Sequence, residues 1–338
     1  MLAAEMRKGL SRAVFVLVFL MIALNIALIL FEPKPPEAGV PAQPSSDVFE
    51  GYDTAVLADA VIARDRLSGD GATHVRELYA SLQKSVDDKE IHHDGLDPYL
   101  GENSAYLHGI LYGRVMVVAW VEVGVLGMLV AMTIVGYDRA VGVQPVIWSS
   151  TVGRAVWGWK LLASTVLALA VAVVVIGVTM TVFIGRFGCG GWSDQVSSGW
   201  NRSLADPAWP FITWDRMTGL DYLGASLGIG MGLVVCFALL GAGLASLLRH
   251  AVAGFIVAVI IVLAMVVAPV ALTAGHVSYS LAMMTPLSLA LSAGRWFTDG
   301  GGVAIWPHYE TLGLIGTASV VTLLISAAFI AVRKEDLI

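Results

Sequence analysis

Six long apolar blocks constrain this sequence more than any other feature. Each is close to the length of about 20 residues with which a helix crosses a hydrocarbon core of roughly 30 Å. Backbone groups find no water to bond with in lipid, so each block is expected to be helical. Charged residues make up only 14% of the chain, against about 25% in a typical soluble domain, which excludes a soluble enzyme. The predicted spans are Ala13–Phe31, Val115–Val135, Leu161–Ile184, Tyr222–Leu248, Ala251–Ala274 and Leu312–Val332.

Basic residues indicate how these spans are oriented, because short cytoplasmic loops are enriched in Lys and Arg. If all six blocks cross the membrane, the connections on the side of the termini are short and basic. The segment after the first span, residues 32–108, is instead rich in acidic residues. The sequence therefore predicts cytoplasmic termini and an extracytoplasmic segment 32–108. The basic residues assigned to the cytoplasmic side are Arg7, Lys8, Arg12, Arg139, Arg154, Lys160, Arg249, Arg333 and Lys334.

A further apolar segment, Ser280–Gly294, is too short to span the bilayer comfortably and is interrupted by Pro286. Such a segment suits two half-helices that enter and leave the same leaflet. The alternative is a seventh span, which would place Arg333 and Lys334 outside, against the charge pattern. We therefore predict a re-entrant helix pair over about residues 280–294.

The pattern divides the chain into three parts: an amphipathic N-terminus with the first span (1–31), an extracytoplasmic insertion (32–108) and the remaining spans (109–338). The insertion begins with a proline-rich stretch, which is typical of an extended tether. Two stretches with helical spacing of apolar residues follow, separated by Ser68-Gly69, and predict a helical hairpin. This hairpin could handle substrate, bind an envelope protein, or cap the spans of its own chain.

The connection between the second and third spans has a helical pattern of its own. Four apolar residues, Trp148, Val152, Val156 and Trp159, fall on one side of a helix. The spacing predicts a short amphipathic helix over about residues 144–160, lying at the inner membrane surface. Such a helix can transmit force from a partner to the spans. A plain interfacial linker is the alternative interpretation.

The same connection resembles the intracellular segment of the type-2 ATP-binding-cassette (ABC) transporter permeases. In that family, charged residues and a Gly follow the second span, a Ser/Thr group ending in a small residue and Arg lies on the coupling helix, and a Lys opens the third span. The matching runs are Tyr137-Asp138-Arg139-Ala140-Val141-Gly142, Ile147-Trp148-Ser149-Ser150-Thr151-Val152-Gly153-Arg154 and Lys160-Leu161-Leu162-Ala163. The resemblance implies ATPase-coupling roles for Asp138, Arg139, Trp148, Ser149, Ser150, Gly153, Arg154 and Lys160.

The order of spans and outer segments also resembles this family over nearly the whole chain, and the resemblance implies a division of labour. Family members pair with a second permease subunit, identical or related, and each binds a cytosolic ABC ATPase. This chain has no Gly-x-x-x-x-Gly-Lys-[Ser/Thr] phosphate loop, so ATP and Mg²⁺ are expected in the partner and no cofactor in this chain. The resemblance implies export of a peptide, drug or lipid across a bacterial cytoplasmic membrane. The alternatives are a complex that relays ATP energy to residues 32–108 without transport, and a membrane-anchored scaffold or sensor with no ATPase.

Polar residues are rare inside the predicted spans. Glu122 lies in the second span, where a carboxylate is costly unless it is paired or faces water. It is predicted either to line a substrate pathway or gate, or to pair with Arg114 or a hydroxyl group. Asn25 in the first span is predicted to form an interhelical hydrogen bond.

Small and flexible residues mark two other candidate regions. The resemblance places an outer gate around Met283, Met284 and Pro286, although Met more often fills apolar space. Three glycines at four-residue spacing in the fourth span predict close helix packing, within the subunit or across a dimer. These packing residues are Gly224, Gly228 and Gly232.

The remaining residues do not form a catalytic set. The histidines match neither a Ser-His-Asp pattern nor a metalloprotease pattern. No metal site is predicted at His92-His93-Asp94, because adjacent residues on a helix do not share a face. The net charge of −6 argues against a general nucleic-acid binder.

Overall fold

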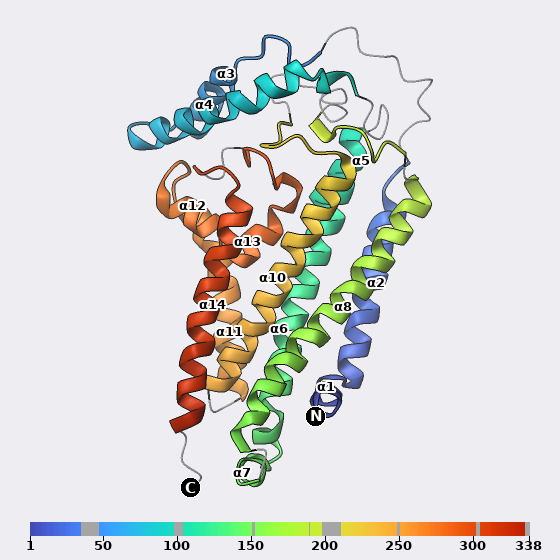
Figure 1. The fold of residues 1–338 in the computed structure, drawn as a ribbon, viewed down its shortest axis with the longest axis vertical. Coiled ribbons are helices and arrows are strands. Elements are labelled where there is room, and N and C mark those ends of the chain that lie inside the picture. Colours follow the sequence, from blue (N-terminus) through green and yellow to red (C-terminus); the bar gives the residue numbers. More distant parts are fainter. Residues whose placement is uncertain are drawn as a thin grey trace.

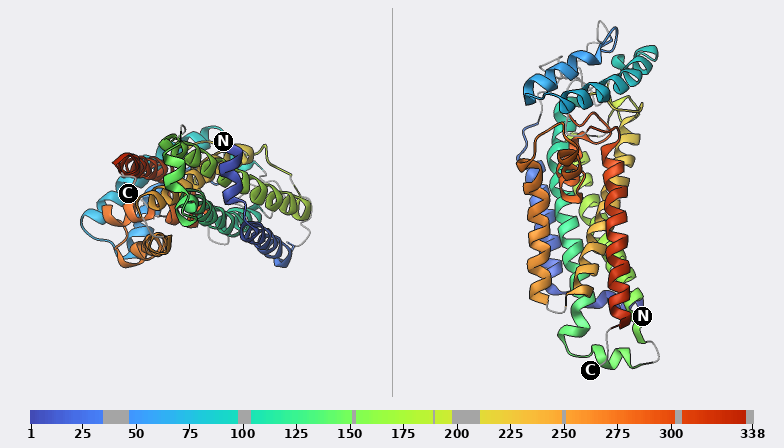
Figure 2. Two further views of the ribbon diagram at one scale, coloured as in Figure 1. Left: turned by 90° about the horizontal axis from the view of Figure 1, so that it is seen from below. Right: turned by 90° about the vertical axis from the view of Figure 1, so that its left-hand side faces the viewer.

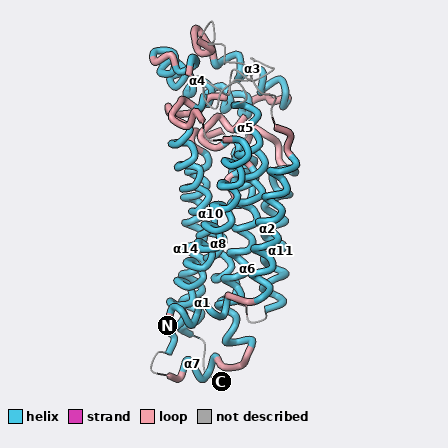
Figure 3. The backbone as a smooth tube through the Cα atoms, turned by 90° about the vertical axis from the view of Figure 1, so that its right-hand side faces the viewer, coloured by secondary structure: helices cyan, strands magenta, loops and turns pink. Residues whose placement is uncertain are grey.

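The structure is a computed structural model that describes residues 1–34, 47–97, 104–150, 153–188, 190–197, 211–248, 251–301 and 305–334. Within these ranges the regular elements are all helices, as the all-α prediction requires, and no strand is formed. The loops gather at the two ends of an elongated helical bundle (Figure 1, Figure 3).

In the part of the chain that the structure describes, six helices are long and apolar enough to cross a membrane, which agrees with the predicted number of candidate spans. They run side by side along the molecule (Figure 1). Several extend beyond the predicted limits, because hydropathy marks only the part that suits lipid, whereas helical hydrogen bonding continues into the polar flanks. Four of them are single helices: α2 (Arg12–Phe31), α10 (Gly219–Leu247), α11 (Ala251–Ala271) and α14 (Tyr309–Lys334). The span Tyr106–Ala140 combines most of α5 (Ser104–Ile110) with the π-helical turn η3 (Leu111–Val115) and α6 (Met116–Ala140). The span Gly153–Phe187 combines η4 (Gly153–Ala155) with α8 (Val156–Phe187).

A short helix, α1 (Leu2–Gly9), precedes these six. Gly9 is buried so closely against Ile134 and Leu167 that a Cβ there would lie 2.8 Å from either side chain. Ser11 then starts α2, because its hydroxyl accepts a hydrogen bond from the first turn at 3.3 Å. Helix α1 and the last turn of α14 lie at the same end of the bundle, which we call the α1 end (Figure 1). Which side of a membrane this end faces stays a prediction.

Glycine lets α10 pack tightly against α6 at the centre of the bundle. A Cβ on Gly241 would lie 2.3 Å from the carbonyl oxygen of Met128, and one on Gly230 would lie 2.3 Å from the ring of Trp120. Neither distance is possible between real atoms, so a larger residue at either position would push the two helices apart. The close approach of α6 and α10 therefore depends on both glycines.

The three glycines that the sequence marks for packing lie on other faces of α10. Gly232 meets α14, where a Cβ would lie 2.8 Å from the side chain of Leu314. Gly224 and Gly228 have no described atom of another helix within 4 Å of where a Cβ would be. Close packing at these two positions stays a prediction that concerns a second subunit.

Two helices of the insertion, α3 (Thr54–Asp65) and α4 (Asp70–Ile91), form the predicted hairpin. They lie across the end of the bundle opposite to α1 (Figure 1). We call the described insertion, residues 47–97 with this hairpin, the cap, and this end of the bundle the cap end. Their turn contains Arg66 and Gly69, both at positive φ. Apolar residues of both helices form a small core of their own, which Ile212 from the loop before α10 completes. The insertion thus packs on its own chain.

The segment predicted to be re-entrant contains two short helices, α12 (Val277–Met283) and α13 (Pro286–Leu291). Pro286 is the first residue of α13, where its missing N–H costs nothing and its fixed φ suits a helix start. Helix α13 is almost entirely buried, whereas α12 is partly exposed. The helix break is therefore where the sequence places it, while entry into a membrane leaflet stays a prediction.

The helix predicted over about residues 144–160 is much shorter than expected. Helix α7 (Gln144–Trp148) ends after one turn, and the chain resumes at Gly153 with a φ of +52°. Val156 and the residues after it belong to α8. The prediction of one continuous helix is therefore wrong: the apolar spacing continues across a backbone break that only glycine adopts easily. Two residues of the pattern, Thr151 and Val152, lie outside the described residues.

Apolar side chains cover the outside of the bundle. Phe19 on α2, Val270 on α11 and Leu323 on α14 are exposed, with many other large apolar residues on the same helices. Helices α2 and α14 lie on opposite sides of the bundle (Figure 2). Faces of this extent suit lipid or another membrane-embedded chain rather than water.

We expect Gly241→Ala to destabilise the protein by about 1–3 kcal/mol, since its methyl group would clash with the backbone of α6. Thermal unfolding in detergent would measure the loss. Gly228→Ala is the matched control on the same helix, because nothing described lies within 4 Å of the new methyl group. Equal unfolding temperatures for the two variants would contradict the packing described above.

Candidate functional site

A buried carboxylate joins three helices at the α1 end. Asp138, in the last turn of α6, is 2% exposed. It accepts hydrogen bonds from Lys8 of α1 and from Lys160 of α8, each at 2.7 Å. Lys8 also pairs with Glu5, one turn earlier in α1, at 2.7 Å. Both Asp138 and Lys160 face the interior and join helices of this chain, and the ATPase-coupling role that the resemblance implies for them stays a prediction.

Further bonds attach the same region to α10. Arg139 donates through Nη1 to the carbonyl oxygens of Ala245 and Leu248, at 3.3 and 3.2 Å. These carbonyls lie at the C-terminal end of α10, where a cation is favourable. The indole N–H of Trp157, near the start of α8, donates to the Ser246 hydroxyl at 2.9 Å. Helices α6 and α8 are thereby fixed to the end of α10.

Arg154 connects the turn before α8 to α14. Its Nη1 donates to the carbonyl oxygen of Arg333 at 2.9 Å, in the last turn of α14. Its guanidinium also lies 5.6 Å from the ring of Trp148, the last residue of α7. Arg154 therefore holds α7 and α14 to the same turn, which the sequence did not indicate.

The exposed surface of this region belongs to α7 and the residues before it. Val146 is 70% exposed, and Val141 and Val143 are also exposed. Ser149 and Ser150 are exposed too, and their hydroxyls donate to carbonyls of their own turn. The resemblance gives the two serines a coupling role but gives none to the valines. The sequence could have indicated this surface, because three valines lie close together in the connection between the second and third spans.

Glu122 has a partner on a neighbouring helix. The side-chain amide of Asn25 in α2 donates to its Oε2 at 3.0 Å. The interhelical hydrogen bond predicted for Asn25 is confirmed, and the alternative that pairs Glu122 with Arg114 is wrong. Arg114 instead pairs with Glu32 at the end of α2. The π-helical turn of η3 alters the angular spacing between the residues on either side of it. A role for Glu122 in a pathway stays a prediction.

A cavity of about 860 Å³ lies under the cap, between α3, α6, α11 and α13, and we call it the cap cavity. Met283 lines it, together with Ser288 and Leu291 of α13. Met284 packs instead into the core, and Pro286 is buried at the start of α13. Of the three predicted gate residues, one therefore faces the cavity.

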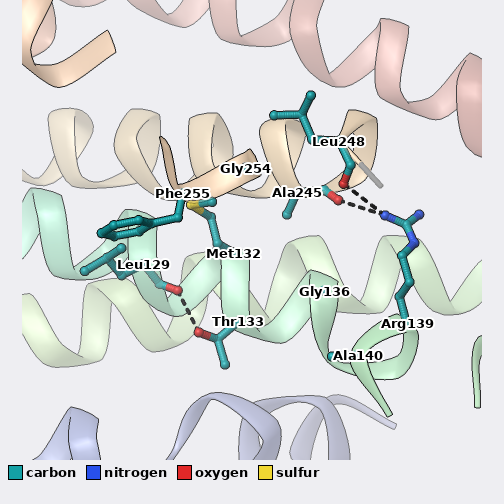
Figure 4. A pocket seen from close by; sticks show the side chains of 10 residues that line it. All are labelled: Leu129, Met132, Thr133, Gly136, Arg139, Ala140, Ala245, Leu248, Gly254 and Phe255. Atoms are coloured by element: carbon teal, nitrogen blue, oxygen red, sulfur yellow. Dashed lines mark hydrogen bonds between the residues drawn. The ribbon is translucent and has the colours of Figure 1, made fainter. Parts of the chain in front are cut away.

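A second cavity, of about 450 Å³, lies between α6, α10 and α11 toward the α1 end (Figure 4). Leu129, Met132 and Phe255 give it apolar walls, and Arg139 lies at one end with its bonds to α10 (Figure 4). Gly136 also lines it and leaves space where a side chain would stand. The walls suit an apolar occupant and provide no acid–base chemistry.

Buried polar contacts attach the cap to the rest of the chain. Lys89 of α4 is 1% exposed, and its ammonium donates to the Ser85 hydroxyl and the Thr213 carbonyl, both at 2.7 Å. Burial lowers its pKa to about 8, although nearby carboxylates, Asp94 foremost, favour the charged form. The carboxylate of Asp94 accepts hydrogen bonds from Nε and Nη2 of Arg216, each at 2.7 Å. The cap is therefore fixed to the loop before α10 by charged groups.

A second contact joins the cap to the loop after α13. The hydroxyl of Tyr79 in α4 donates to the carboxylate of Asp299, whose pKa is raised by burial. The indole of Trp214 donates to the Thr298 carbonyl of the same loop at 2.7 Å. Movement of either loop would thus be transmitted to the cap.

Comparison with known proteins finds no family model, curated protein or solved structure that matches this chain. Among the residues that the structure describes, no group of three His, Cys, Asp or Glu side chains is placed to hold a metal ion.

Replacing Asp138 by Asn should loosen α1 and destabilise the chain by about 3–5 kcal/mol, because Lys160 would be left as a buried charge without its carboxylate. Thermal unfolding and hydrogen exchange of α1 would measure both effects. The double variant Asp138→Asn/Lys160→Met removes the isolated charge and should recover part of the loss. A double variant no more stable than Asp138→Asn would contradict this account of the ion pair.

Lys89 should make the stability of the cap depend on pH in an unusual direction. Its pKa in the fold, about 8, is below the ordinary value, so the cost of burying the charge is present below pH 8 and disappears as the pH rises toward 10.5. The unfolding temperature should therefore rise between pH 7 and 9.5, below the range where tyrosines ionise. In Lys89→Met this rise should be absent, whatever the absolute stability. The same slope in both proteins would contradict the assignment.

Proposed function

We propose that this chain is the membrane-spanning permease subunit of an ABC-type transporter, which exports an amphipathic substrate with energy from a separate ATPase chain. ATP and Mg²⁺ belong to that partner. The observation that carries the proposal is the attachment of the α6–α8 connection to the rest of the bundle. The side chains of Asp138, Arg139 and Arg154 join it to α1, α10 and α14, Asp138 from a buried position and Arg154 from an exposed one.

This attachment makes α7 a lever. A partner that displaced α7 would move the ends of several helices together, since hydrogen bonds of 2.7–3.3 Å join these ends to the connection. Packed helices change between discrete arrangements rather than deform continuously. ATP-driven closure of two partner subunits would in this way shift the bundle between two packings.

The proposal also assigns the two sides of the membrane. The basic residues Lys8, Arg139 and Arg154 gather at the α1 end, which we place in the cytoplasm of a bacterium. The cap then lies outside. A second permease subunit would cover part of the apolar surface, and the open glycines Gly224 and Gly228 offer one face for it.

One observation favours mechanical relay as a second candidate. The cap is fixed through Arg216 and Asp299 to the loops that precede α10 and follow α13. Rocking of the spans would therefore move the cap, with or without passage of a substrate. Transport and relay share the ATPase partner, whereas a scaffold or sensor would have none.

The decisive experiment is co-purification with an ABC ATPase, which the proposal expects to be encoded beside this gene. Val146→Asp should remove most of the bound ATPase, because it places a charge on the exposed apolar surface of α7. Val56→Asp is the matched control, since Val56 is a similarly exposed valine on the cap, at 60%. Arg154→Glu is less specific, because it also breaks the contact with α14. An ATPase that binds wild type and both variants alike would contradict docking at α7.

Accessibility labelling tests the side assignment independently. With Cys189 replaced by Ser, a Ser150→Cys variant should react with an impermeant maleimide in inverted vesicles and stay unlabelled in intact cells. The native Cys236 is buried and should contribute little background. Labelling of position 150 from outside intact cells would end the proposal.

A further inference from the structure

The cap cavity has one apolar side and one polar side. Val266, Pro269 and Val270 of α11 line it with Leu291 of α13. Val270 is 85% exposed and Leu291 is exposed as well, so the apolar side continues onto the outer surface of the bundle. In a membrane this surface would face hydrocarbon, and an acyl chain could enter the cavity along α11.

The polar side carries two guanidinium groups and one carboxylate, from Arg64, Arg295 and Asp299. Arg64 binds the carboxylate of Asp65 through two nitrogens, at 2.8 and 2.7 Å. Asp299 accepts from the hydroxyl of Tyr79 and from the backbone N–H of Gly301. Arg64 and Asp299 therefore already have partners within the chain.

Of the two guanidinium groups, that of Arg295 is held by the longer described hydrogen bond. Its side chain is exposed at the cavity, and its described hydrogen bond is a long one, at 3.4 Å, to the carbonyl of Gly300. A guanidinium can bind a phosphate or carboxylate through two parallel hydrogen bonds, so it is well suited to an anionic group.

We propose that the cap cavity binds an anionic amphiphile of the membrane leaflet at the cap end, with its phosphate head on Arg295 and an acyl chain against α11. Identifying this amphiphile as the cargo rests on the proposed function, whereas the binding site itself does not. A soluble anion would leave the apolar side in contact with water. A neutral hydrocarbon would cover the exposed guanidinium of Arg295 without offering it an acceptor in place of water, which is costly. An amphiphile satisfies both sides, and the volume of about 860 Å³ lies in the range of ligand sites.

Native mass spectrometry of the purified chain in non-ionic detergent can measure this binding directly. Phosphatidylglycerol is the probe, phosphatidylcholine with the same acyl chains tests the charge, and inorganic phosphate tests the need for a tail. We expect phosphatidylglycerol to bind at least tenfold more tightly than the other two. Arg295→Gln should lower its affinity about tenfold, whereas Arg76→Gln, at an exposed arginine on the cap outside the cavity, should not.

A second pair of variants tests the cavity without changing charge. Gly113 lines the cap cavity and has open space where a side chain would stand, so Gly113→Phe should fill the site and abolish binding. Gly136→Phe is the matched control, since it fills the cavity at the α1 end instead. Both should leave the unfolding temperature nearly unchanged.

Several results would overturn the inference. Equal binding of phosphatidylcholine, unchanged affinity in Arg295→Gln, or unchanged affinity in Gly113→Phe would each do so, and so would inorganic phosphate that binds as tightly as the lipid. These measurements need no ATPase. If no ATPase co-purifies but phosphatidylglycerol binds as expected, the proposed function fails and the site stands. If the ATPase co-purifies and Arg295→Gln binds normally, the site alone fails.

Discussion

The carboxylate of Asp138 is the interaction on which the α1 end of this protein depends. Removing it from water is costly, and the cost is offset because Lys8 and Lys160 both donate to it at 2.7 Å. An arrangement of this kind specifies one packing, since any displacement of α1 or α8 leaves a buried charge without its partner. The same requirement fixes the helix ends on both sides of the connection between α6 and α8, and the proposed lever depends on this.

Close packing of helices, rather than ion pairing, stabilises the middle of the bundle. Gly241 lies directly against the backbone of α6 at Met128, Gly230 leaves room for the ring of Trp120, and Gly232 leaves room for Leu314 of α14. In lipid there is little hydrophobic gain from bringing helices together, so close contact supplies much of the attraction. Helices α2 and α11 have much less of this contact, which fits a role at the lipid boundary or at a second subunit.

Much of the fold could be predicted from the sequence, because its causes are local. Block length gives the six spans, Gly69 marks the hairpin turn, and Pro286 marks the break between α12 and α13. The site was less accessible to prediction. The pairing of Lys8 with Asp138 joins residues 130 positions apart, and no spacing rule reports such a contact. The apolar pattern after α7 was misleading, because the positive φ of Gly153 interrupts a helix that periodicity alone would continue.

The position of Lys89 has a consequence for the order in which the protein is assembled. Helices α3 and α4 leave the ribosome well before Thr213, the residue whose carbonyl receives the Lys89 ammonium, and before Ile212, which completes their core. Until that loop arrives, Lys89 stays hydrated and fully charged, and the hairpin lacks part of its apolar interior. The hairpin therefore matures late, when the fourth span is delivered, and during that interval it is the part of the nascent chain most open to chaperones and proteases.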